Sequence, residues 1–161
     1  MEIDTLRFGP LQVDEKKLLR FKSGLPGLED CAEFAILQFE ESNPLHWLQS
    51  TQRPEVCLPI INAFAICPGY AFDISDEDVE ELALNGPEDV YVVSVVLIPE
   101  RDIEQMTANL VAPIIINHRS GSAKQIIINS GEYNVRFPVF QTICNLIKED
   151  EADAGALPQD K

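Results

Sequence analysis

The segment from residue 90 to residue 98 (VYVVSVVLI) constrains the fold of this chain more than any other. Its side chains are mostly β-branched and almost wholly apolar, which is typical of a strand covered on both faces. Further β-favourable runs are short and end at turn residues; they span 34–39, 45–50, 114–116 and 125–128. The pattern predicts a mainly β chain with seven or eight short strands and one or two short helices. We expect a small single-domain antiparallel β-barrel-like fold or a compact sandwich.

Turn residues predict two hairpins in this fold. Gly9-Pro10 separates two short extended pieces at residues 2–8 and 11–13, so we expect the first turn there. A polar, glycine-containing loop at 117–124 separates the runs 114–116 and 125–128, which predicts the second hairpin. Pro113 cannot donate a ladder hydrogen bond and is therefore expected at a strand start or sheet edge.

One helix is well signalled and a second is weaker. Ser75 is a suitable N-cap, and the acidic residues of the first turn favour the positive end of the helix dipole. Gly86 and Pro87 are expected to end this helix. The second helix is expected from about residue 139 to 148. The segment 149–161 is acidic and has few apolar side chains, so we expect a β domain at 1–148 followed by a disordered acidic tail.

The charge is strongly negative and unevenly distributed. The formal net charge is −15, and residues 23–100 contain one base, Arg53, against fifteen acids. Such a block repels phosphate, so direct nucleic-acid binding is not expected. It favours encounter with a basic partner, although acids that only keep the protein soluble remain an open alternative.

The sequence contains no motif of a known catalytic or metal site. It has no nucleophile elbow, no phosphate-binding loop and no C-x-x-C pair among its four cysteines. The loop from His118 to Ser122 is the only neighbourhood with both a nucleophile and a base, and it keeps an enzymatic role open as the weaker alternative. We expect no cofactor and no metal. No run reads as a membrane span or export signal, so the cytoplasm is the expected location.

Several segments have unusual chemistry. FKSGLPGLE at 21–29 places two glycines and a proline between apolar residues, which predicts a tight turn with positive φ. WLQS at 47–50 places the only tryptophan beside a polar amide, and TANLVAPIIIN at 107–117 enters a strand through Pro113. A further strand begins with Gln125.

These four segments, in this order, resemble the flagellar assembly factor (FliW) family. The run at 21–29 looks like that family's F-x-x-G-(I/L)-P-G-aromatic/Leu-E signature, with Leu28 where many relatives place an aromatic residue. The resemblance extends from residue 3 to about residue 140 and leaves the acidic tail outside. It implies a small β-barrel-like fold and a non-enzymatic, protein-binding role, and we expect the chain to be a monomer.

The resemblance also implies two partners, flagellin and the carbon storage regulator CsrA. CsrA is a small RNA-binding protein that blocks flagellin translation. When flagellin is exported, the freed assembly factor captures CsrA and flagellin synthesis resumes. A regulator that binds RNA should have basic surface, for which the acidic block is a suitable docking face.

The expected site residues form three sets. The acidic docking set comprises Glu77, Asp78, Glu80, Glu81, Glu88 and Asp89. The other residues expected to contact a partner are Trp47, Gln49, Asn109 and Asn117, although turn-capping or core packing would also explain them. The structural motif positions are Phe21, Gly24, Pro26, Gly27, Glu29, Thr107, Leu110 and Pro113. A barrel that holds a small ligand remains the alternative, and it would require an interior pocket of roughly 300 Å³ or more.

Overall fold

The computed structural model describes residues 1–39 and 43–159, with the side chains of its last helix described up to Glu149. Strands dominate the described part of the chain. They are β1 (Glu2–Thr5), β2 (Gly9–Gln12), β3 (Leu19–Phe21), β4 (Glu33–Leu37), β5 (His46–Ser50), β6 (Cys57–Asn62), β7 (Val90–Leu97), β8 (Thr107–Ala108), β9 (Ile114–Asn117), β10 (Ser122–Gln125) and β11 (Phe137–Pro138). The α-helices are α1 (Ala63–Ile66), α2 (Asp76–Glu81) and α3 (Phe140–Gln159), and 3₁₀ turns occur at Glu15–Lys17, Pro87–Asp89 and Ile103–Gln105.

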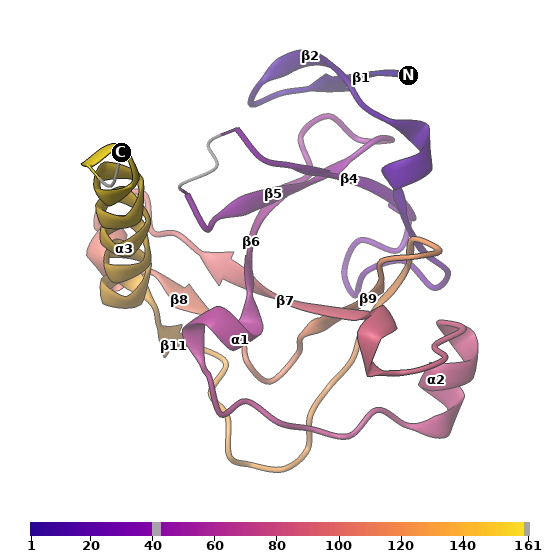
Figure 1. Ribbon diagram of the computed structural model, residues 1–161. Helices are drawn as coiled ribbons and strands as arrows, with labels where there is room; N and C mark the ends of the chain where they lie inside the picture. The colour runs from indigo at the N-terminus through magenta and orange to yellow at the C-terminus, as the bar shows by residue number, and fades with distance from the viewer. Residues whose placement is uncertain (40–42, 160–161) are drawn as a thin grey trace.

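Seven strands close into a barrel (Figure 1). The order around the ring is β7-β6-β5-β4-β3-β10-β9, and β9 pairs with β7 to close it. Every pairing in the ring is antiparallel except that of β10 with β3. The predicted antiparallel barrel is therefore confirmed, with one parallel pairing that the sequence did not indicate. β8 and β11 extend the sheet from the end of β7.

Alternate side chains of the barrel strands serve two different cores. In β7, Val93 points into the barrel interior, whereas Val92 packs outward under α2 and the loops around α1. The interior is filled by large, fully buried side chains: Phe21, Phe34, Leu48, Ile60, Ile114 and Ile116. The 90–98 run is thus covered on both faces from Val92 to Val96, as predicted, whereas Leu97 is 59% exposed. Such packing of the interior argues against the small ligand that the alternative reading places there.

The first hairpin differs from the prediction. Gly9 and Pro10 lie within β2, opposite Thr5 and Asp4, and the turn itself is at residues 6–8. The Thr5 hydroxyl donates to the carbonyl of Gly9 and accepts from the main-chain N–H of Phe8, which holds this turn. A side-chain hydrogen bond therefore takes the turn role that we had given to Gly9-Pro10. The hairpin covers the outer face of β4 and β5.

The second hairpin is tighter than predicted. β10 begins at Ser122 and ends at Gln125, so the loop spans only 118–121 and the isoleucines at 126–128 follow the strand. Gly121, at φ +85°, lets the main chain approach the carbonyl of Leu18 on the way into β3. This close approach fixes the early start of β10.

Helix α2 begins where the sequence predicts and ends earlier. The Ser75 hydroxyl accepts from the main-chain N–H of Asp78, which confirms the N-cap. The helix ends at Glu81, because Leu82 is the C-cap and Ala83 adopts a positive φ of 53°. Gly86 instead caps the following 3₁₀ turn. The predicted end at Gly86-Pro87 is therefore wrong.

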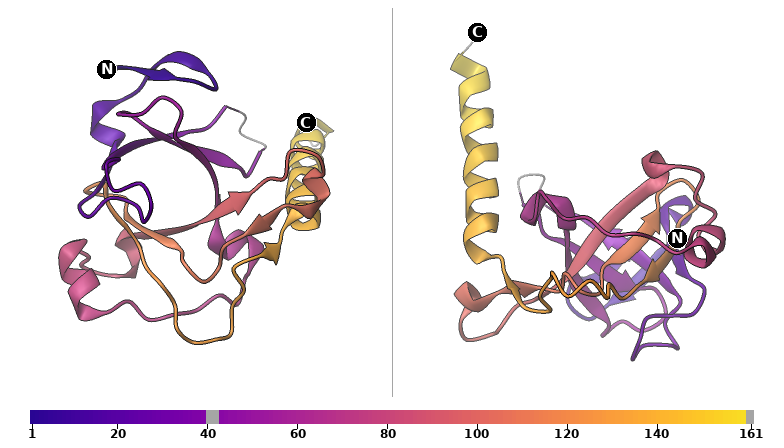
Figure 2. Two further views of the ribbon diagram at one scale, coloured as in Figure 1. Left: turned by 180° about the vertical axis from the view of Figure 1, so that it is seen from behind. Right: turned by 90° about the horizontal axis from the view of Figure 1, so that it is seen from below.

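Helix α3 starts near the predicted position and continues to Gln159, past the expected end at 148. Phe140, Ile143 and Ile147 pack against the outer core, and the helix then projects away from the barrel (Figure 2). The division into a β domain at 1–148 and a disordered tail at 149–161 stays a prediction, and its last two residues lie outside the described part.

Candidate partner-binding surfaces

The loop at 21–29 closes one end of the barrel. Phe21 is 1% exposed and lies edge-on to Phe34, with 5.3 Å between the ring centroids. Gly24 (φ +69°) and Gly27 (φ +83°) confirm the predicted positive-φ turn. A Cβ on Gly24 would lie 2.8 Å from the Cα of Glu29, so only glycine fits there. The Glu29 carboxylate accepts from the main-chain N–H of Gly27 and steadies the loop tip.

The four motif segments converge on one groove at the barrel rim. Its volume is about 850 Å³, and it opens to solvent between the start of β6 and the end of β7. Each motif segment contributes to its lining: Leu25, Pro26 and Leu28 from the first, Trp47 from the second, Thr107 and Asn109 from the third, and Gln125 from the fourth. Segments far apart in the sequence thus form one surface, which we call the rim groove.

The rim groove is apolar with charged edges. Leu97, Ile103 and Val135 line it and are each more than half exposed. Arg7 lies over the Trp47 ring, 4.6 Å from its centroid, and Arg136 lines the groove as well. Glu100 also lines the groove, so charges of both signs border its apolar lining.

Trp47 is half-buried on the outer face of β5, where its ring also meets Phe8 edge-on at 5.7 Å. It packs beneath the N-terminal hairpin and at the same time lines the rim groove. Trp47 thus keeps its place among the partner-contact candidates.

The polar amides of the motif segments have internal partners. Gln49 is fully buried and its amide donates to the carbonyls of Ser50 and Pro54. Asn117 is 3% exposed; its amide donates to the carbonyls of Leu82 and Ala83. The Asn117 carbonyl oxygen accepts from two main-chain N–H groups of the loop that follows. These bonds hold the end of α2 and the β9–β10 turn, so Gln49 and Asn117 present no side chain to a partner.

Asn109 serves the local backbone and still lines the groove. Its side-chain oxygen accepts from the main-chain N–H groups of Val111 and Ala112, each at 3.0 Å. Thr107 lies in β8, Leu110 is 1% exposed in the outer core, and Pro113 directly precedes β9. The predicted strand-start position of Pro113 is therefore confirmed.

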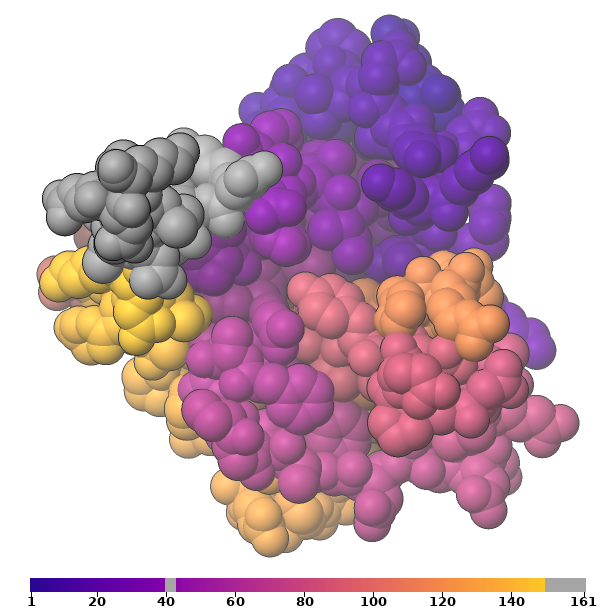
Figure 3. Space-filling model, viewed as in Figure 1, coloured from indigo at the N-terminus to yellow at the C-terminus, as the bar shows by residue number. Residues whose placement is uncertain are grey.

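The acidic docking set separates into free and engaged carboxylates. Glu77, Glu80 and Glu88 are exposed, and we call these three the acidic face. Asp78 and Glu81 instead bind the Lys124 ammonium, at 2.6 Å and 3.5 Å. The hydrogen bond between Lys124 and Asp78 lowers the pKa of the Asp78 carboxyl and raises the pKa of the Lys124 ammonium. These two ion pairs join α2 to β10. In Figure 3 the orange tip of the β9–β10 hairpin lies against the pink α2 region.

Asp89 does not belong to the docking surface. It is 1% exposed, accepts from the main-chain N–H of Asn85 at 2.8 Å and pairs with Arg119 at 3.1 Å. The Asn85 hydrogen bond, followed by the Arg119 pair, holds the pKa of Asp89 below its usual value. The expectation of an exposed Asp89 is therefore corrected: it is an internal anchor for the loop that leads into β7.

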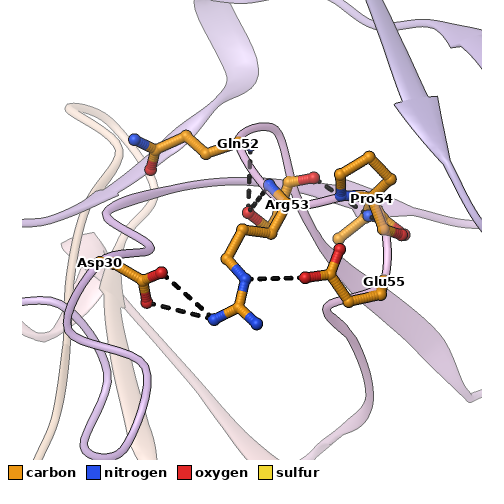
Figure 4. A network of polar contacts seen from close by, with 7 residues as sticks. Asp30, Gln52, Arg53, Pro54 and Glu55 are labelled. Atoms are coloured by element: carbon orange, nitrogen blue, oxygen red, sulfur yellow. Dashed lines mark hydrogen bonds and ion pairs between the residues drawn. The ribbon is translucent and has the colours of Figure 1, made fainter.

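Arg53, the single base of residues 23–100, is held between two acids (Figure 4). Its Nε donates to Glu55 at 2.8 Å, and its terminal nitrogen reaches Asp30 at 3.2 Å. These contacts join the loop after β5 to the end of the glycine-rich loop. Arg53 is thus paired with acids of its own neighbourhood, and the acidic face lies elsewhere on the molecule.

The His118 loop shows no catalytic pairing in the described part of the chain. The His118 Nε2 lies 2.6 Å from the main-chain oxygen of Glu88, and the Ser120 hydroxyl accepts from the main-chain N–H of Ser122. Among the described residues, no cluster of three or more metal-ligating side chains is found. Within the same residues, no helix has both the length and the apolar character to cross a bilayer.

A closed, filled barrel with a grooved rim defines a small single-domain β-barrel protein. The FliW protein family model matches residues 2–139. The chain is 35% identical to the flagellar assembly factor FliW of Clostridium tetani (88% of this chain, 97% of that one) and 37% identical to that of Moorella thermoacetica (98% and 96%). A crystal structure of the flagellar assembly factor FliW superimposes with a TM-score of 0.80 at 31% identity, covering 87% of this chain and 97% of that one. The chain belongs to the FliW family of flagellar assembly factors.

The groove residues Leu97, Ile103, Val135 and Arg136 were not among the predicted site residues. Leu97 was assigned to a strand covered on both faces, and no local pattern distinguishes the other three. Their place in one groove depends on how β6, β7 and the neighbouring loops lie in the folded chain, which is a tertiary feature. Only the motif positions pointed to this end of the barrel.

Proposed function

We propose that this flagellar assembly factor binds flagellin and the regulator CsrA in exchange, in the cytoplasm and without catalysing a reaction. In this role it relieves CsrA repression of flagellin translation when flagellin is exported. Family membership supports the general role, and the two partners come from the resemblance of its motif segments. The observation that carries the CsrA part is the acidic face, whose three carboxylates are exposed beside α2.

The acidic face suits a basic partner for a physical reason. Asp78 and Glu81 share Lys124, whereas Glu77, Glu80 and Glu88 have no ion pair among the described residues. Unpaired exposed carboxylates leave a negative field that extends about one Debye length, roughly 8 Å at physiological salt. Such a field accelerates the encounter with basic surface, typically by a factor of ~10 to 10³ at low salt.

Size-exclusion chromatography with light scattering tests the exchange itself. We expect a complex with flagellin, a complex with CsrA from the same bacterium, and loss of the CsrA complex when flagellin is added. Folded protein that binds neither partner at tens of micromolar would refute the proposed function.

The triple substitution E77Q/E80Q/E88Q tests the acidic face. We expect slower CsrA association, by about tenfold at low salt, and a shallower dependence of the rate on salt. Stopped-flow fluorescence measures both quantities. D30N/E55Q is the matched control, because it neutralises acids that Arg53 already pairs. An unchanged rate and salt slope in the triple variant would remove the acidic face from the account.

A further inference from the structure

The barrel has a second end, opposite the one that the loop at 21–29 closes. Strand β4 ends there at Leu37, and β5 begins there at His46. A cavity of about 380 Å³ opens at this end, and we call it the barrel mouth. Leu19 and Ile116 of the interior core also line it, so a ligand in the mouth would rest on the packed core. The volume lies within the range of small-molecule pockets, roughly 300–1,000 Å³.

The inward-facing side chains change from apolar to polar where the strands reach the mouth. Alternate residues of a strand face the same side of the sheet. Leu48 and Val93 belong to the interior core, so His46 and Tyr91, each two positions nearer the mouth, face inward as well. Both are half-buried and line the cavity. The mouth therefore has an imidazole and a phenol directly above the apolar interior.

Two lysines border the mouth from the 3₁₀ turn that precedes β3. Lys16 and Lys17 both line the cavity, and the Asp14 carboxylate caps their turn by accepting from the main-chain N–H of Lys16. Both lysine side chains are exposed, and neither forms an ion pair within the described residues. Glu15 shares their turn but does not line the cavity. Two ammonium groups are therefore held at the entrance.

No acidic side chain lines the mouth in the described part of the chain, although the whole chain has a net charge of −15. His118 lines the rim, and its Nε2 lies 2.6 Å from the main-chain oxygen of Glu88. A carbonyl oxygen only accepts, so this nitrogen carries the proton and the ring is held in place. Burial raises the pKa of the Tyr91 phenol, which stays an O–H donor at neutral pH. The titratable groups of the mouth are thus bases and one neutral donor.

We propose that the barrel mouth binds a small organic anion, with a carboxylate or phosphate group on an apolar body. The anionic group pairs with Lys16 and Lys17 and accepts from the Tyr91 hydroxyl, and the apolar body rests on Leu19 and Ile116. A cationic ligand would meet two ammonium groups and no carboxylate. An extended polyanion would be repelled by the acidic block of the chain, so a small molecule fits best. The site is independent of flagellin and CsrA.

Nuclear magnetic resonance titration of the isotope-labelled full chain tests the site. Phenyl phosphate and phenylacetate are the anionic probes, and benzyl alcohol offers a similar apolar body without the charge. We expect saturable shifts of the amide signals of Lys17, His46 and Gly121 at the mouth, and none at Gly27 at the closed end. Saturation by phenyl phosphate alone would assign a phosphate ligand, and saturation by phenylacetate alone a carboxylate. Saturation by both would support the site for either group.

Substitutions at the mouth test which groups hold the anion. K16Q/K17Q should weaken binding by about fivefold, because it removes two exposed ammonium groups. Tyr91→Phe should weaken it by about twofold or more, since it removes one hydrogen-bond donor. K22Q/K148Q is the matched control: it removes the same charge from exposed lysines that do not line the cavity, and the affinity should be unchanged.

Three results would overturn the anion site. The first is the absence of saturable shifts at the mouth with either anion at millimolar concentration. The second is equal affinity of wild type and K16Q/K17Q, and the third is binding of benzyl alcohol as tight as that of the anions. Each would leave the proposed function standing, because neither flagellin nor CsrA enters the experiment.

Discussion

The acidic face and the rim groove lie on the same barrel and are built in opposite ways. The acidic face is a set of solvated carboxylates, two on helix α2 and Glu88 on the following 3₁₀ turn, with neighbouring acids held by Lys124. The rim groove is an apolar hollow bordered by Arg7, Arg136 and Glu100. Exposed charges act at long range and mainly change association rates, whereas apolar burial acts on contact and mainly changes dissociation. One small domain can therefore serve two partners of different chemistry.

β10 connects the two regions. Lys124 joins it to α2, and the neighbouring Gln125 lines the groove, where its amide donates to the carbonyl of Ala112 at 2.9 Å. β7 makes a second connection, since it follows the Pro87–Asp89 turn and ends at the groove.

The largest expected loss of stability follows from a substitution in the barrel interior. Phe21→Ala should lower the free energy of unfolding by about 3–5 kcal/mol, because it leaves a cavity next to Phe34. Urea denaturation measures this loss. Leu6→Ala, at a position 78% exposed, is the control and should stay within about 0.5 kcal/mol of wild type. Equal losses in the two variants would contradict the filled interior described here.

Substitutions in the loop at 21–29 should cost less stability than one in the barrel interior. Gly24→Ala should cost about 1–3 kcal/mol, since it combines a positive φ with a Cβ placed against the Glu29 backbone. Gly27→Ala has the same sign of φ but meets no atom within 4 Å, so its cost should be lower. Thermal unfolding of both variants ranks them. A Gly27 variant less stable than the Gly24 variant would show that close approach does not govern this loop.

The ion pair beneath the acidic face should contribute least. Lys124→Met should cost about 0.5–1 kcal/mol at neutral pH, as expected of a partly exposed pair. The pKa of Asp78 is lowered in the folded state, so its stabilising contribution is present above its unfolded pKa and is lost as the pH falls through the folded value. The difference between wild type and variant should therefore shrink below about pH 4. Urea denaturation at pH 7 and pH 3 checks this, and a difference that grows at pH 3 would contradict it.

The features of the fold that were predicted correctly are those that depend on neighbouring residues. The Ser75 cap, the 90–98 strand and the positive φ of Gly24 are confirmed because each depends on nearby residues or on a continuous apolar run. The turn at Gly9-Pro10 was wrong because the Thr5 hydroxyl supplies the turn bonds instead. The helix end at Gly86 was wrong because Asn117, from a distant strand, binds the carbonyls at Leu82 and Ala83.

The candidate site was only partly predictable for the same reason. Glu77, Glu80 and Glu88 are exposed as the sequence suggested, whereas Gln49, Asn117 and Asp89 are buried by contacts that no local pattern indicates. The groove brings Pro59 of β6 and Val96 of β7 together, a juxtaposition that only the barrel register creates. Pro59 was visible in the sequence, but its partner strand was not.

The most direct test follows labelled CsrA by fluorescence anisotropy while flagellin is added to the wild-type protein. We expect flagellin to release the bound CsrA. No release, from protein that binds each partner separately, would contradict the proposed exchange.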